Sequence, residues 1–184
     1  MPATPVETHE RQAGAHRHRV FFALWPDDLV RESITRATRT AVRQCGGRPT
    51  PRANLHVTLA FLGPLTPEDL AKVLALTPPP VAPFELVLDR LGLWERAQVL
   101  WIGPTGIPQP LTRLEQALWT ALVALGFQRE PRPYRPHVTI ARKAQAARGA
   151  VAAVAWRVDG IALVESRPGP RRSRYDVLKS WRFA

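Results

Sequence analysis

The chain of 184 residues is poor in cysteine and in long apolar runs. Its single cysteine, Cys45, excludes an intrachain disulfide and a cysteine-rich metal site, as is typical of proteins from the reducing cytoplasm. The first apolar run, Val20 to Trp25, has six residues and follows a polar stretch, so we expect neither a signal peptide nor a membrane span of about 20 residues. These absences predict a cytoplasmic protein without a membrane partner.

Lysine is also scarce, since it supplies only three of the 26 basic residues. The net charge of +11 therefore comes from arginine, and most of it lies in residues 128–148, with +5, and 165–184, with +4. Clustered basic side chains suit a polyanionic partner because they replace the counterions of phosphate groups. Charge alone leaves the alternative of an arginine-rich solvated surface open.

The order of the predicted elements repeats along the chain. Residues 1–18 show no apolar periodicity, so we predict a disordered basic tail there and a single domain over residues 19–184. Within this domain, a strand, a helix, a loop and a histidine-containing strand occur twice, with the histidines 81 residues apart. The repeat predicts two similar lobes that face one another across a cleft.

Two histidines outside the predicted tail, His56 and His137, stand in nearly identical tetrapeptides. The two tetrapeptides are His56-Val57-Thr58-Leu59 and His137-Val138-Thr139-Ile140. Residues i and i+2 of a strand project from the same face, so each motif directs an imidazole and a hydroxyl to one side and packs its aliphatic residues behind. A lone histidine near a strand is more often a core residue, but that interpretation would have to hold twice for the same sequence.

The chemistry of this residue set suits a phosphate group. Two hydroxyls can bind its oxygens, and two imidazoles can act as acid and base because the ordinary histidine pKa of about 6.5 lies near working pH. Arg142, five residues after His137, would add a fixed positive charge, unless it is a solvent-exposed arginine at a strand end. The nearest carboxylates, Glu68, Asp69 and Glu130, lie outside both motifs, so we expect no metal and no cofactor.

With their flanking residues, 54–63 and 134–142, the motifs resemble the paired motifs of the 2H phosphoesterase superfamily. The greater similarity is to its branch of RNA 2′,3′-cyclic phosphodiesterases, also called 2′-5′ RNA ligases. The resemblance extends from Arg19 to Trp181 and implies a bilobal α+β fold, with two pseudo-symmetric lobes of antiparallel sheet plus helices around a central cleft. Departures are mild: Tyr134 replaces a more common phenylalanine, and Ile140 replaces a leucine.

The resemblance also implies an activity and its residues. It implies metal-independent hydrolysis of RNA 2′,3′-cyclic phosphate ends to 2′-phosphomonoesters, with the reverse 2′-5′ ligation as a further activity. By match to the motifs, the proton donor is His56, the proton acceptor is His137, the phosphate-binding hydroxyls are those of Thr58 and Thr139, and Phe61 helps to form the wall that binds the base. The expected partner is RNA with cyclic phosphate ends, such as tRNA fragments, and we expect the protein to be a monomer.

Two other functions remain open at this point. The first is an RNA-binding module without turnover, which predicts salt-dependent RNA binding and no product from cyclic phosphate ends. The second is a 2H phosphodiesterase that acts on a small cyclic nucleotide. The paired histidines argue against the first, because binding alone does not need two titrating imidazoles, and the basic segments favour RNA over the second.

Overall fold

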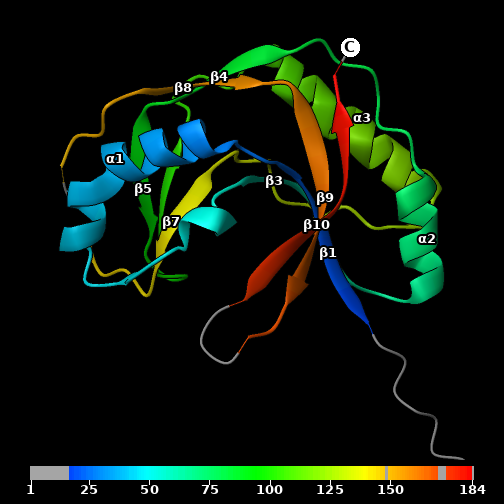
Figure 1. Cartoon of the computed structure of the whole chain (residues 1–184), viewed down its shortest axis with the longest axis horizontal. Helices are drawn as coiled ribbons and strands as arrows, with labels where there is room; N and C mark the ends of the chain where they lie inside the picture. The colour runs from blue at the N-terminus through cyan, green and yellow to red at the C-terminus, as the bar shows by residue number, and fades with distance from the viewer. Residues whose placement is uncertain (1–16, 148, 170–172, 184) are drawn as a thin grey trace, which may run out of the picture.

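The computed structural model describes residues 17–147, 149–169 and 173–183. Its elements follow one another in chain order as β1 (His18–Leu24), α1 (Asp28–Gln44), β2 (Arg48–Pro49), the 3-10 turn η1 (Arg52–Asn54), β3 (Val57–Leu65), α2 (Pro67–Ala75), β4 (Phe84–Leu88), β5 (Arg90–Trp94), β6 (Val99–Gly103), α3 (Gln109–Ala124), β7 (Val138–Arg142), β8 (Val154–Val158), β9 (Gly160–Arg167) and β10 (Arg174–Arg182) (Figure 1). The predicted α+β class with antiparallel sheets is confirmed.

The strands form one large sheet and one small one. The eight-stranded sheet has the order β10-β9-β1-β3-β7-β6-β5, with β2 paired to β7, and β4 and β8 form a separate pair. All of these pairings are antiparallel. The large sheet has two halves, which meet where β3 and β7 pair through Val57 and Val138 alone. The two halves belong to one continuous sheet, and the expected similarity of two lobes remains a prediction.

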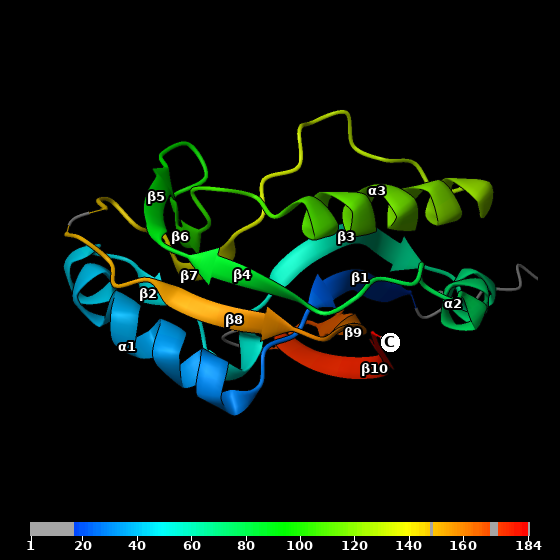
Figure 2. The ribbon, with the colours of Figure 1, turned by 90° about the horizontal axis from the view of Figure 1, so that it is seen from above.

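The helices pack across this junction. Helix α1 follows β1 of one half but contacts β7 of the other half, and α3 follows β6 but contacts β3 (Figures 1 and 2). Helix α1 also contacts β8 of the small sheet. One core cluster of buried side chains includes residues of the three helices, of both sheet halves and of the small sheet. Because α1 and α3 each bridge to the other half, their packing fixes the relative position of β3 and β7.

Matching irregularities in β3 and β7 decide which side chains share a face. In the pairing of β3 with β1, Leu59 has no partner. In the pairing of β7 with β6, Ile140 at the equivalent position has none either. An extra residue of this kind, a β-bulge, turns the residues after it onto the opposite faces of the strand. Phe61 and Arg142, each five residues after its histidine, therefore occupy equivalent positions on the face that carries the histidines.

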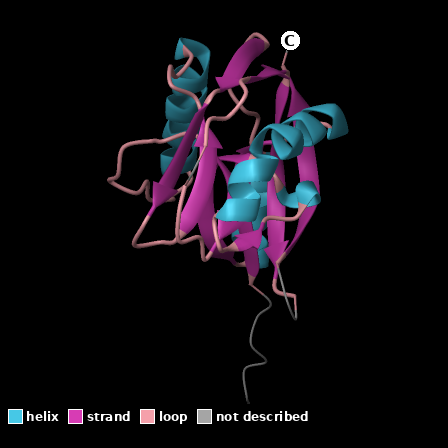
Figure 3. Cartoon of the chain, turned by 90° about the vertical axis from the view of Figure 1, so that its left-hand side faces the viewer, coloured by secondary structure: helices cyan, strands magenta, loops and turns pink. Residues whose placement is uncertain are grey.

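The predicted boundary between tail and domain was wrong at its last residue. Strand β1 begins at His18, so this residue is not part of a tail, and residues 1–16 lie outside the described residues. Residues 84–94 form two successive strands, β4 and β5, which belong to different sheets because β4 pairs with β8 and β5 pairs with β6. Figure 3 shows helices and strands of the whole chain from the side. No described helix is long and apolar enough to cross a membrane.

Candidate active site

The two histidine motifs line one cavity of about 430 Å³. Since β3 and β7 pair antiparallel at the residue after each histidine, the register sets His56 opposite Thr139 and Thr58 opposite His137. All four side chains belong to the lining of this cavity. The structure thus brings the four predicted residues together in one cavity, with the two motifs on paired strands.

Both imidazoles are oriented by the same hydrogen bond. His56 Nδ1 lies 2.7 Å from the carbonyl oxygen of Asn54, and His137 Nδ1 lies 2.8 Å from that of Arg135. A carbonyl oxygen only accepts hydrogen bonds, so each Nδ1 donates its hydrogen and each neutral ring has its lone pair on Nε2. The Thr58 hydroxyl lies 3.1 Å from His56 Nε2 and donates to it. The nitrogen that can exchange a proton with a ligand is therefore Nε2 in both motifs.

Aromatic side chains surround both histidines. The His56 ring lies 4.8 Å from the ring of Phe21, 5.8 Å from Trp25 and 5.4 Å from Tyr175, measured between centroids. The His137 ring packs against the edge of two indoles, those of Trp94 at 4.4 Å and Trp101 at 6.4 Å. None of these five aromatic residues was predicted from the sequence, because they come from β1 and the residue after it, β5, β6 and β10, far from either motif.

These surroundings lower the pKa of both histidines. Burial lowers the pKa of His56 to about 4; the carbonyl of Asn54 opposes this shift, and the positive charges of Arg142 and Arg31 add to it. Burial also lowers the pKa of His137, opposed by its own backbone hydrogen bond and reinforced by Arg142. Both imidazoles are consequently neutral in the ligand-free protein at neutral pH.

Arg142 and Phe61 lie at the cavity, on the face to which the bulges in β7 and β3 turn them. Both side chains are exposed, and both belong to the cavity lining. Arg142 forms no salt bridge within the part of the chain that the structure describes, so its guanidinium has no carboxylate partner there. The guanidinium of Arg19 lies 5.4 Å from the centre of the Phe61 ring. An anion in this cavity would meet a positive charge, two hydroxyls and two imidazoles.

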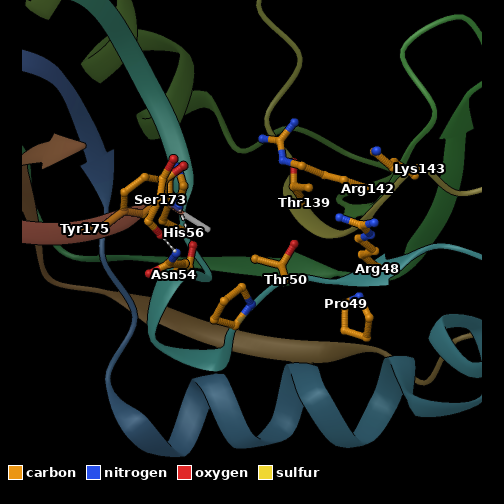
Figure 4. Close-up of a pocket in the computed structure, with 11 residues that line it drawn as sticks. Arg48, Pro49, Thr50, Asn54, His56, Thr139, Arg142, Lys143, Ser173 and Tyr175 are labelled. Carbon is orange, nitrogen blue, oxygen red and sulfur yellow. Dashed lines mark hydrogen bonds between the residues drawn. The ribbon is translucent and has the colours of Figure 1, made fainter. Parts of the chain in front are cut away.

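A second cavity, of about 640 Å³, adjoins the first and shares residues with it (Figure 4). The shared lining residues are His56, Thr139, Arg142, Ser173 and Tyr175. The second cavity extends towards β2 and there includes Arg48, Thr50 and Lys143. No signal in the sequence pointed to Arg48 or Thr50, since β2 has two residues and no recognisable strand pattern.

A third described histidine, His18, has a different environment. Its Nδ1 lies 2.6 Å from a carboxylate oxygen of Glu165, and it lines neither cavity. The expectation that the folded domain holds two histidines was therefore wrong. Among the described residues, no three histidine, cysteine, aspartate or glutamate side chains gather as metal ligands.

Comparison with known proteins identifies relatives along most of the chain. A sequence profile of the 2′-5′ RNA ligase superfamily matches residues 25–170. The RNA 2′,3′-cyclic phosphodiesterase of Escherichia coli K12 is 34% identical over 168 residues, which cover 89% of this chain and 95% of that protein. The RNA 2′,3′-cyclic phosphodiesterase of Thermus thermophilus is 32% identical over 178 residues, which cover 89% of each of the two chains. The crystal structure of E. coli LigT complexed with 3′-AMP superposes with a TM-score of 0.83, at 30% identity, over 91% of this chain and 98% of LigT.

Proposed function

The chain belongs to the 2′-5′ RNA ligase superfamily, and we propose that it hydrolyses the 2′,3′-cyclic phosphate ends of RNA to 2′-phosphomonoesters. The observation that carries this proposal is the pairing at Val57 and Val138, which sets two His-Thr motifs against one another in one cavity. Binding alone would not need two imidazoles that each present Nε2 to the cavity. A phosphate that must receive a nucleophile on one side and release an oxygen on the other does need them.

The reaction follows from this arrangement. His137 Nε2 takes a proton from water as the water oxygen bonds to phosphorus, and the bond between phosphorus and the 3′-oxygen breaks. His56 Nε2 gives its proton to that 3′-oxygen, which leaves the phosphate on the 2′-oxygen. The assignment of donor and acceptor follows the order of the two motifs in the family. The reverse reaction would join a 2′-phosphate end to a second RNA.

The non-reacting oxygens of the phosphate are held by the remaining residues. The hydroxyls of Thr58 and Thr139 donate to them from the two sides of the cavity, and Arg142 supplies the positive charge. Phe61, placed beside Arg19 at the same cavity, offers its ring face to the terminal base. None of these steps requires a metal ion, because acid, base and charge stabilisation all come from side chains.

Substrate binding supplies the protonation state that the reaction needs. His56 must carry a proton, yet its pKa in the free protein is about 4. The bound cyclic phosphate is an anion, so it offsets the charge of Arg142 and favours the protonated form of the neighbouring imidazole. Binding of the substrate is therefore coupled to protonation of His56, which then donates this proton to the departing 3′-oxygen.

The experiment that tests the proposal compares histidine variants on a 2′,3′-cyclic phosphate. His56→Ala and His137→Ala should each lower turnover by at least about 100-fold, the range for loss of a general acid or base. His18→Ala, outside both cavities, is the matched control and should retain activity if folded. Addition of a chelator should change nothing. A folded His56→Ala or His137→Ala protein with near-wild-type turnover would refute the assignment.

The same assay separates the two alternatives. An RNA-binding module without turnover would bind the oligonucleotide and release no product. A phosphodiesterase for small cyclic nucleotides would turn over a cyclic mononucleotide faster than an RNA end. The cytoplasmic location, the monomeric state and the single domain over residues 19–184 remain predictions from the sequence.

A further inference from the structure

The second cavity lies beside the segment between β2 and β3, which pairs with β7 at its two ends but not between them. β2 pairs with the end of β7, and the Thr50 backbone N–H donates to the carbonyl of Ile140 at 2.9 Å. The next residue pair that joins this part of the chain to β7 is Val57 of β3 with Val138. Seven positions separate Thr50 from Val57, but only two separate Ile140 from Val138, so the intervening chain loops outwards. The space of about 640 Å³ lies along this loop.

Three cations meet at this cavity without acidic partners. Arg48 lies directly opposite Arg142 in the β2–β7 pair, and Lys143 follows Arg142 in the chain; all three line the cavity (Figure 4). Like charges placed opposite one another in an antiparallel pair destabilise a sheet. Within the described ranges, none of the three forms a salt bridge. An anion in the cavity would offset this repulsion.

A buried hydroxyl points to the same kind of ligand. The Thr50 Oγ1 atom is buried and has no hydrogen-bond partner among the described residues, although the residue lines the cavity. A buried polar atom without a partner is costly, and native proteins usually satisfy such atoms. Figure 4 shows Thr50 between Asn54 and Arg48, on the floor of the space that Arg142 borders. Because the oxygen is shielded from solvent in this rotamer, the side chain has to rotate before its hydroxyl donates to a phosphate oxygen in the cavity.

The backbone around Lys143 is fixed in an uncommon conformation. Its φ is 57°, in the left-handed region that residues other than glycine seldom adopt. The N–H of the next residue, Ala144, donates to the carbonyl of Gln98 at 3.0 Å. The N–H of Gln145 donates to the carbonyl of Cys45 at 2.7 Å. Such conformations persist where the surrounding structure enforces them, and they concentrate at functional sites.

We propose that Arg48, Thr50 and Lys143 form a second phosphate subsite, which binds the phosphodiester one nucleotide to the 5′ side of the cyclic phosphate. This inference rests on the proposed function, which places the cyclic phosphate between His56 and His137. A 2′,3′-cyclic phosphate ends an RNA chain, so its neighbouring phosphate lies on the 5′ side. The second cavity is the place for it because both cavities share Arg142 and Thr139. The enzyme should therefore prefer oligonucleotide ends to cyclic mononucleotides.

The test measures kcat/KM for a cyclic mononucleotide and for a dinucleotide that ends in the same cyclic nucleotide. The wild-type protein should prefer the dinucleotide by about tenfold or more, the effect of hydrogen bonds to one charged group. Arg48→Gln and Lys143→Gln should each remove most of this preference through a higher KM for the dinucleotide. Arg113→Gln, an arginine on α3 outside both cavities, is the matched control and should keep the preference.

A modified substrate tests the subsite without any variant. A dinucleotide with an uncharged methylphosphonate linkage should lose the preference in the wild-type protein and be insensitive to Arg48→Gln. Equal kcat/KM for the mononucleotide and the charged dinucleotide, with turnover of both, would overturn the second subsite and leave the proposed function intact. An unchanged preference in both variants would also overturn the subsite. Absence of hydrolysis of either substrate would overturn the proposed function itself.

Discussion

Replacement of the two threonines by valine tests the phosphate-binding role directly. Thr58 and Thr139 are half-buried strand residues, and valine keeps their branched shape and suits a β-strand. The substitution therefore removes the hydroxyl with little change to the backbone. Thr58 donates to His56 Nε2 in the free protein, and its hydroxyl has to turn to a phosphate oxygen when the substrate binds.

The magnitude follows from the charge of the ligand. A hydrogen bond to a charged group contributes about 1.5–3 kcal/mol, so each variant should lower kcat/KM by roughly 10- to 150-fold. The two hydroxyls come from different strands but bind the same phosphate, so the double variant measures the coupling between them. The assay is initial-rate hydrolysis of a 2′,3′-cyclic mononucleotide, with folding checked by circular dichroism.

Thr120→Val is the matched control, because Thr120 is exposed on α3 and its hydroxyl donates to the carbonyl of Gln116. This variant should keep wild-type kcat/KM. If folded Thr58→Val or Thr139→Val proteins lose less than about threefold, the hydroxyls do not hold the phosphate, because even one neutral hydrogen bond contributes about that much.

Three further predictions concern pH and stability. The pKa values of His56 and His137 are both lowered, and kcat/KM reports the protonation states of the free enzyme. We therefore expect kcat/KM to peak below about pH 6.5. A kcat/KM that still rises above neutral pH would contradict this. Burial opposes ionisation of Glu165, but hydrogen bonds from His18 and Arg167 prevail and lower its pKa, so this stabilisation exists at neutral pH and is lost as pH falls. Glu165→Gln should thus cost about 1–3 kcal/mol in urea unfolding at neutral pH and less at acidic pH; equal losses would refute it. Gly92→Ala would place its Cβ 2.1 Å from the Trp101 indole and should lower stability by about 1–3 kcal/mol in thermal unfolding, and an unchanged transition would contradict the packing.

Local alternation in the strands was enough to predict which side chains of each motif share a face. His56 and Thr58 share a face because they are two positions apart on an extended backbone, and the same holds for His137 and Thr139. The tetrapeptides also predicted buried aliphatic residues behind the site, and Leu59 is buried as expected. These features depend on neighbours in the chain, so the sequence pattern contains them.

Features that depend on distant pairings could not be predicted. The bulges that turn Phe61 and Arg142 to the cavity arise from register with β1 and β6, which no local pattern records. The boundary at residue 18 was wrong because His18 is ordered through β1 and through Glu165, a partner 147 positions away. The subsite at Arg48 was missed for the same reason, since its lining combines β2 with β7.

In the proposed reaction, His137 activates water for attack on the phosphorus and His56 protonates the departing 3′-oxygen. Product analysis of an oligonucleotide with a 2′,3′-cyclic phosphate end tests it most directly, with a phosphatase-sensitive label at the terminal phosphate and a chelator present. We predict a 2′-phosphomonoester as the product from the wild-type protein, formed at least about 100-fold more slowly by the His56→Ala and His137→Ala variants. A 3′-phosphomonoester, or a reaction that stops when the chelator is added, would contradict the claim.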